Sequence, residues 1–375
     1  MNRKLSIGII GMLMILLFAC SPAQDTAPGS DSAASTTPPA LPLSEPGPYF
    51  TGNREYTFVD ESRDGREIKV TLWYPALQQT DANGQPVQLN APPDLSKAPY
   101  PLILTESSSG SFLFKSHLAS HGFVTARIQI PDHKEYFNWD INMVNWPRDF
   151  VFVLDQLASV PLEGLENVID TERVGATGYS YGGDISLTLG GARIDPEFYL
   201  KYCKKPPRIK TECCDFEWYA EYSCGLAERW EQFTERVGEK ITVSEDGLWQ
   251  PVTDERIRAV MPMAASGAWL YGKRGLEAVD RPVLMIAATE DEYVPYKDET
   301  AYIFEKLGAS EKSLISFIGE DHMMMEESDP VAKMKHFATA FFGYHLQGRQ
   351  EYAEYITQDF VSQFEDLAWG KYRGN

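Results

Sequence analysis

The sequence predicts an α/β fold in which a mostly parallel sheet is flanked by helices. Short apolar runs such as Pro101-Leu102-Ile103-Leu104 have the length and composition of strands that are buried on both faces. Longer segments between these runs, such as 147–159, carry apolar residues at helical spacing. Strands that alternate with helices along a chain form a parallel sheet covered by helices, so we expect this architecture here.

The sheet is predicted to begin with an antiparallel hairpin that turns at 63–65. In its second strand Val70 and Leu72 alternate with Lys69 and Thr71, which indicates one buried face. The expected strands, in chain order, are 54–60, 67–74, 101–104, 123–128, 173–178, 257–263, 282–287 and 314–318. The expected helices are 114–121, 147–159, one that follows residue 180 and ends at 190–191, 330–346, and a last surface helix after residue 350.

The first 19 residues are predicted to be a signal peptide. Two basic residues precede an apolar run from Leu5 to Phe18, which is short for a membrane span and typical of a secretory signal. Leu17-Phe18-Ala19-Cys20 resembles the lipobox of bacterial lipoproteins, and this implies cleavage before Cys20 and acylation of that residue. An ordinary secretory signal with a chance cysteine and an uncleaved membrane anchor are the alternatives.

Residues 20–48 are predicted to form a disordered tether between the lipid anchor and a folded domain at 49–375. The stretch from Ser21 to Pro48 consists mainly of Ser, Ala, Thr, Pro, Asp and Gly. Such a composition buries too little apolar surface to offset the entropy lost on ordering. We therefore expect an exported, membrane-anchored lipoprotein whose domain lies outside the cytoplasm.

The charge of the chain excludes one class of partner. The formal net charge is −20, with 54 acidic and 34 basic residues. A chain this acidic repels nucleic acid and does not bind anionic lipid through charge. The hydrophobic fraction of 43% and the aromatic fraction of 12% are sufficient for a sizeable core.

Four cysteines lie close together within a segment, 195–256, that interrupts the alternation of strands and helices. In an exported protein an even, clustered set of cysteines predicts two local disulfides. Adjacent cysteines rarely bond each other, so Cys203 and Cys224 are the expected partners of Cys213 and Cys214. A zinc site is the alternative, although the spacing lacks a Cys-x-x-Cys pair and no histidine is near. We expect the segment to be a disulfide-braced insertion that covers the site.

Ser180 lies in Gly178-Tyr179-Ser180-Tyr181-Gly182, a Gly-x-Ser-x-Gly pattern that follows a predicted strand. This pattern is typical of a sharp strand-to-helix turn that exposes a nucleophilic serine at the edge of a sheet. The backbone N–H of Tyr181 would lie at the start of the next helix, where it can stabilise a developing oxyanion.

An acid and a histidine follow in the order that such a serine needs. Acids come directly after the predicted strand 282–287, and we select Asp291 because Asp-x-x-Val-Pro places it on the loop; Glu290 and then Glu292 are the alternatives. His322 follows the next predicted strand. A serine nucleophile, an imidazole base and a carboxylate that orients the base constitute a catalytic triad.

A second oxyanion donor is expected from the loop that follows the strand at 101–104. This loop consists of small residues and includes Ser107, Ser108 and Ser109. Loops after central parallel strands lie at the carboxyl edge of the sheet, where ligands bind. Backbone N–H groups of Ser108 and Ser109 are therefore the candidates.

With these motifs in place, the chain resembles the α/β-hydrolase superfamily, and within it the dienelactone-hydrolase-like group that includes platelet-activating-factor acetylhydrolases. The resemblance covers about 47–190 and 256–345, and the segment 195–256 lies outside it. Relatives usually have a His-Gly pair where this chain has Ser107-Ser108. True dienelactone hydrolases use a cysteine nucleophile, and Ser180 in its place indicates ordinary carboxylic esters as substrates.

The sequence thus predicts a serine hydrolase that cleaves short-acyl or lipid-like carboxylic esters through an acyl-enzyme intermediate. This mechanism needs no cofactor and no metal. The expected partners are a small-molecule or lipid ester as substrate and a membrane bound through the lipid anchor, but no nucleic acid. A peptidase or amidase with the same triad and a non-catalytic, lipid-tethered binding protein are the alternatives.

Overall fold

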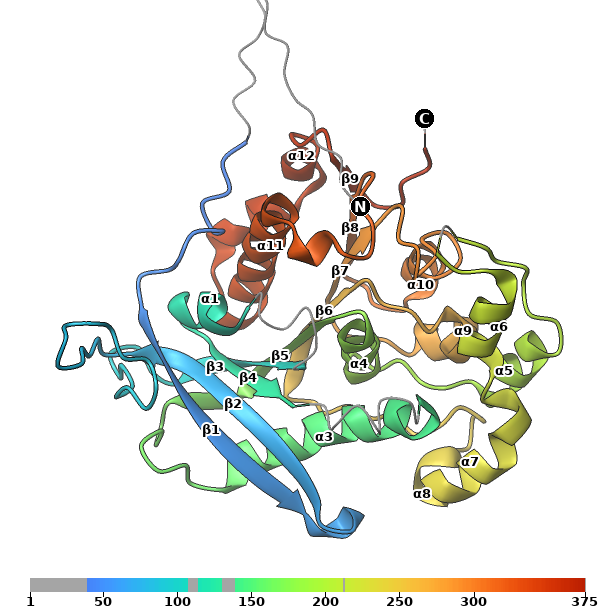
Figure 1. The fold of residues 1–375 in the computed structure, drawn as a ribbon, viewed down its shortest axis with the longest axis horizontal. Helices are drawn as coiled ribbons and strands as arrows, with labels where there is room; N and C mark the ends of the chain where they lie inside the picture. Colours follow the sequence, from blue (N-terminus) through green and yellow to red (C-terminus); the bar gives the residue numbers. More distant parts are fainter. Residues whose placement is uncertain (1–38, 107–113, 130–138, 212, 375) are drawn as a thin grey trace, which may run out of the picture. The chain divides into compact units, whose positions relative to one another are not determined.

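One sheet forms the centre of the described part of the chain (Figure 1). The computed structural model describes residues 39–106, 114–129, 139–211 and 213–374. The strands are β1 (Phe50–Asp60), β2 (Arg66–Ala76), β3 (Tyr100–Glu106), β4 (Val124–Ile128), β5 (Ile169–Tyr179), β6 (Ile257–Met263), β7 (Val283–Ala288), β8 (Lys312–Phe317) and β9 (Leu367–Trp369). Their order in the sheet is β1-β2-β4-β3-β5-β6-β7-β8-β9.

The direction of the strands confirms the predicted α/β class. Neighbouring strands from β4 to β8 run parallel, whereas β1 pairs with β2, β2 with β4, and β8 with β9 in the antiparallel sense. The predicted entry hairpin is therefore present. Strand β9 was not predicted, because three residues are too few to show a periodic pattern. Its pairing of Leu367 with Phe317 closes the far edge of the sheet.

Helices cover both faces of the sheet (Figure 1). On one face, α1 (Lys115–Ser120) and α11 (Ser328–Gln347) pack over a core that contains Ile103 and Phe337. On the other face, α3 (Trp139–Ser159) and α4 (Tyr181–Leu189) pack over a core that contains Leu102 and Leu104. Successive residues of β3 thus point into different cores, as the pleat of a strand requires. The other helices outside 195–256 are η1 (Glu61–Arg63), α9 (Ala268–Glu277), α10 (Thr300–Lys306), η4 (Met324–Glu326), η5 (Gln350–Ile356) and α12 (Gln358–Val361).

The segment 195–256 is helical and connects α4 to β6. Asp195 caps the first helix, since its carboxylate accepts the N–H of Phe198 at 3.1 Å. Asp215 caps the second in the same way through the N–H of Trp218, at 2.9 Å. Its helices are α5 (Pro196–Cys203), α6 (Phe216–Cys224), η3 (Ala227–Arg229), α7 (Trp230–Val237) and α8 (Glu239–Thr242).

All four cysteines of this segment form disulfides, as predicted, but the expected pairing is wrong. Cys203 bonds Cys224, and the adjacent Cys213 and Cys214 bond each other. Cys203 ends α5 and Cys224 ends α6, and the fold brings their Cα atoms to 5.4 Å. That contact removes both from reach of the connecting loop, which leaves the adjacent pair to close on itself.

The folded part of the chain begins before residue 49, the predicted boundary. Leu43 is buried, and its N–H donates to His336 Nδ1 at 3.2 Å. The N–H of Gly47 donates to Ser120 Oγ at 2.8 Å. The predicted signal peptide and Cys20 lie outside the described residues. Within the described ranges, no helix is both long and apolar enough to cross a bilayer.

Candidate active site

Ser180 lies at the turn between β5 and α4. Its backbone has φ +56° and ψ −116°, a conformation that is rare for a residue with a side chain. The N–H of Ser180 donates to the carbonyl of Met263, the last residue of β6, at 3.0 Å, and this bond holds the turn in place. The structure therefore has the sharp turn that the motif predicts.

The two glycines of the motif are required by close packing. A Cβ on Gly178 would lie 2.5 Å from the Cα of Gly182. A Cβ on Gly182 would lie 2.5 Å from Cγ of Glu106, at the end of β3. The elbow helix can start directly above the sheet only because both side chains are absent.

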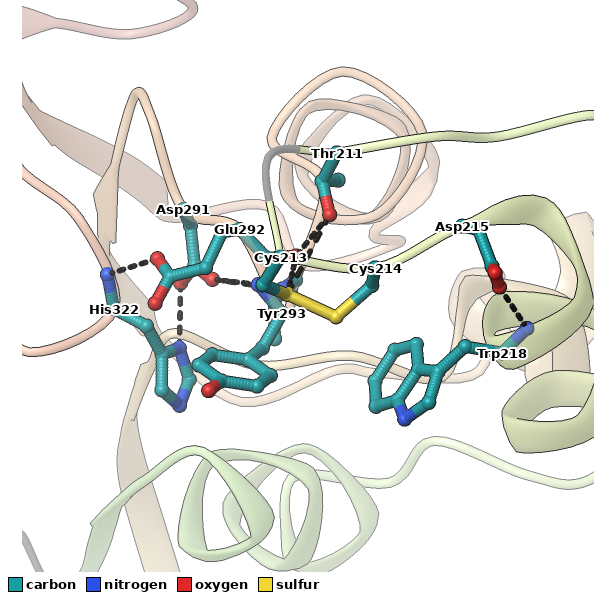
Figure 2. Close-up of a disulfide and its surroundings, with 10 residues drawn as sticks. Thr211, Cys213, Cys214, Asp215, Trp218, Asp291, Glu292, Tyr293 and His322 are labelled. Atoms are coloured by element: carbon teal, nitrogen blue, oxygen red, sulfur yellow. Dashed lines mark hydrogen bonds and ion pairs between the residues drawn. A yellow bond between two sulfur atoms is a disulfide. The ribbon is translucent and has the colours of Figure 1, made fainter.

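Ser180, His322 and Asp291 come together at the carboxyl ends of β5, β8 and β7. His322 Nε2 is 3.2 Å from Ser180 Oγ, and His322 Nδ1 is 2.8 Å from Asp291 Oδ2. Figure 2 shows the contact between Asp291 and the imidazole. These distances are within the range for a nucleophile, a general base and the group that orients it.

The neighbouring residues orient the Asp291 carboxylate. Its Oδ1 accepts the backbone N–H groups of Tyr293 and Val294, at 3.0 and 2.7 Å. Oδ2 is thereby directed at the imidazole. Glu290, one alternative from the sequence, is exposed and donates its own N–H to the carbonyl of Glu320. The geometry therefore favours Asp291 as the partner of His322.

Two further groups position His322, and the sequence did not identify their roles. The carboxylate of Glu292 accepts the backbone N–H of His322 at 3.0 Å. The hydroxyl of Tyr179 donates to the carbonyl of His322 at 2.9 Å. Glu292 and Tyr179 are each adjacent in sequence to a triad residue, but only the fold shows that both hold the histidine loop.

The predicted oxyanion donors are only partly described. Tyr181 is the first residue of α4, so its backbone N–H lies at a helix N-terminus beside Ser180. Ser108 and Ser109 lie outside the described residues. Strand β3 ends at Glu106 and runs parallel to β5, so both strands end at the same edge of the sheet.

Two buried carboxylates, Asp184 and Glu299, connect α6 to neighbouring helices. Asp184, in the first turn of α4, accepts the N–H and the hydroxyl of Ser266, at 2.6 and 3.0 Å. The Ser266 hydroxyl also bonds the hydroxyl of Tyr222, at 2.8 Å. Burial raises the pKa of Asp184 to about 7.

Glu299 has a similar role and also contacts α6. It accepts the N–H of Ala268 at 2.9 Å and the hydroxyl of Tyr219. Burial raises the pKa of Glu299 to about 8. Tyr219 and Tyr222 lie on consecutive turns of one helix, so two buried acids fix α6 against the sheet-covering helices.

This arrangement allows His322 to take the proton of the Ser180 hydroxyl, which can then act as a nucleophile. Among the residues that the structure describes, no three His, Cys, Asp or Glu side chains converge as a metal site.

A scan against models of known protein families found no match to this chain, and neither did a search of curated proteins.

Proposed function

We propose that this protein is a serine hydrolase that cleaves carboxylic esters. The observation that carries the proposal is the hydrogen-bonded chain Ser180–His322–Asp291, with a strained serine at the head of a helix. In the reaction, His322 Nε2 takes the proton of the Ser180 hydroxyl while Oγ attacks the acyl carbon. Asp291 keeps the other imidazole proton on Nδ1 and stabilises the imidazolium.

The tetrahedral intermediate then collapses to the acyl-enzyme. Its oxyanion is stabilised by the N–H of Tyr181 and by the Ser108-Ser109 loop, each donor contributing about 3 kcal/mol. His322 gives its proton to the oxygen of the departing alcohol. A water molecule then attacks the acyl carbon, its proton passes to His322, and Ser180 leaves with that proton as the carboxylic acid is released.

The proposal includes an α/β-hydrolase fold in which 195–256 is a cysteine-rich cap. Its support is the parallel sheet together with the order of the serine, acid and histidine after β5, β7 and β8. Export as a lipoprotein is also proposed, and the two disulfides fit an oxidising compartment. We propose short-acyl or lipid-like esters as substrates.

The test is a chain-length series of p-nitrophenyl esters, from acetate and butyrate to longer acyl groups, with Ser180→Ala as the negative control. Ser159→Ala is the matched control, because Ser159 is exposed at the end of α3, away from the triad. Hydrolysis and labelling by a fluorophosphonate probe should be lost in the first variant alone. Hydrolysis that survives Ser180→Ala would overturn the mechanism. Faster turnover of peptides than of esters would instead identify an amidase.

A further inference from the structure

We propose that Tyr293 and Trp218 form the binding surface for the alcohol portion of the ester, and that this surface selects a planar aromatic alcohol without negative charge. The inference rests on the proposed function and adds the substrate class to it. Tyr293 comes from the loop after β7, and Trp218 comes from α6 in the segment 195–256.

The two rings continue outward from the catalytic imidazole. The Tyr293 ring lies 5.2 Å from the His322 ring, centroid to centroid, at an interplanar angle of 64°. The Trp218 indole lies 6.2 Å from the Tyr293 ring at 65°. Figure 2 shows Tyr293 beside His322, with Trp218 farther from the imidazole. Two faces at such an angle form a corner in which a flat ring can stack on one wall and meet the other edge-on.

Tyr293 and Trp218 are both partly exposed, and the Trp218 ring is also held by a neighbouring aromatic ring. Trp218 is 39% exposed and Tyr293 is 41% exposed. The indole stacks on Tyr222, with centroids 5.3 Å apart and planes within 3°. Tyr222 is in turn held through Ser266 and Asp184. The partly exposed indole of Trp218 is therefore held in place, which reduces the conformational entropy that is lost when a ligand binds.

The catalytic cycle identifies which half of the ester meets these rings. His322 donates its proton to the oxygen of the leaving alcohol, so that oxygen must lie beside the imidazole. A ring attached one or two bonds beyond this oxygen reaches Tyr293 first and then Trp218. The acyl group, which remains on Ser180, lies on the other side of the bond that breaks.

The charge of the loops around the two rings limits the class of alcohol further. Glu290 and Glu292 flank Asp291, and Asp321 precedes His322, so the loops around the rings are acidic. An anionic alcohol is repelled there. A cation can bind over a single aromatic face, so this charge argument excludes anionic alcohols only. A planar arylalkyl alcohol without negative charge fits both the corner between the rings and the charge of the loops.

The experiment compares kcat/KM for benzyl acetate and cyclohexylmethyl acetate, two uncharged esters of similar size that differ in planarity. The native protein should prefer benzyl acetate by about threefold to tenfold, the range of an aromatic contact. Trp218→Ala and Tyr293→Ala should each remove most of this preference, and Trp218→Phe should keep part of it. In both variants kcat/KM for ethyl acetate, which lacks the ring, should fall clearly less than kcat/KM for benzyl acetate. Leu95→Ala, at an exposed apolar residue of another loop, should behave like the native protein.

Four results would overturn the inference. The native protein could show no preference for benzyl acetate, or the two alanine variants could lose as much kcat/KM on ethyl acetate as on benzyl acetate. The variants could lose turnover of ethyl benzoate, whose ring is in the acyl group, and keep that of benzyl acetate, or the native protein could prefer a choline ester to benzyl acetate. Each of these leaves ester hydrolysis by Ser180 intact, so the proposed function would stand. If no ester is hydrolysed and the fluorophosphonate probe does not label Ser180, the proposed function fails and this inference fails with it.

Discussion

The hydroxyl of Tyr179 donates a 2.9 Å hydrogen bond to the backbone carbonyl of His322. The residue before the candidate nucleophile thus supports the loop of the candidate base, across two strands of the sheet. Burial and then the nearby Asp291 carboxylate raise the pKa of Tyr179 well above its usual value. The phenol therefore remains protonated, and able to donate, at neutral and mildly alkaline pH.

Tyr179→Phe should lower kcat and stability together. The buried carbonyl of His322 would lose its partner, at a cost of roughly 1–3 kcal/mol in the free energy of unfolding. Denaturant unfolding and ester kinetics measure the two effects. Tyr100→Phe is the control, because its hydroxyl donates to the carbonyl of Asp94, outside the site. The interpretation fails if both variants lose the same fraction of kcat.

Asp291→Asn should reduce kcat far more than Glu290→Gln. An asparagine in that position would favour the wrong imidazole tautomer, and in serine hydrolases this loss is on the order of 10⁴-fold. Glu290 is exposed and only its backbone N–H is engaged at the loop, so we expect less than about a twofold change. Both variants are to be assayed on the same p-nitrophenyl ester at neutral pH. A larger loss in Glu290→Gln would reassign the acid.

We expect removal of the two disulfides to affect different properties: loss of Cys203–Cys224 should lower stability, and loss of Cys213–Cys214 should lower activity. Cys203–Cys224 links residues 21 positions apart, so replacing both by serine should cost about 3 kcal/mol through the gain in entropy of the unfolded chain. Cys213–Cys214 closes almost no loop, and its removal should change the melting temperature little.

The Cys213–Cys214 disulfide contacts the loop that carries Asp291 and Glu292. Cys213 Sγ is 3.3 Å from the carbonyl oxygen of Glu292, which also accepts the hydroxyl of Thr211 at 2.6 Å (Figure 2). The double variant Cys213→Ser, Cys214→Ser should therefore lower kcat/KM severalfold while the thermal midpoint stays nearly constant. The reverse pattern, with stability lost and activity kept, would exclude this role.

The two buried carboxylates should make stability fall as the pH rises from about 4 to about 8. Asp184 and Glu299 have ordinary carboxyl pKa values of 3.8 and 4.5 when unfolded, and burial raises them to about 7 and about 8. Between these limits the folded protein binds more protons than the unfolded chain, so the free energy of unfolding decreases with pH. Their stabilising contribution is complete below about pH 4 and is lost as the pH passes through 7 to 8.

Two histidines act in the opposite direction at lower pH. Burial lowers the pKa of His117 to about 3 and that of His336 to about 4, so both favour folding above their unfolded value of 6.5 and destabilise as the pH falls below it. Denaturant titrations between about pH 6.5 and 8.5 therefore isolate the carboxylates. The variants Asp184→Asn and Glu299→Gln should each flatten the slope in this window. A slope unchanged in both would show that neither carboxylate controls it.

Much of the architecture was predictable because it depends on local patterns. The apolar runs of β3, β5, β6 and β7 mark buried parallel strands, and the two close-packed glycines mark the turn at Ser180. The boundary near Leu43 and the strand β9 were missed, since a single buried leucine or a three-residue pairing leaves no periodic signal in a sequence.

The sequence by itself determined the α/β class and the order of Ser180, Asp291 and His322, because parallel strands bring the residues that follow them to one edge. It could not determine contacts between segments that only packing brings together. The disulfide pairing, the bond from Tyr179 to His322 and the approach of Trp218 to Tyr293 all depend on where α6 and the loops settle. These contacts join residues that are distant in sequence, so only the tertiary structure decided them.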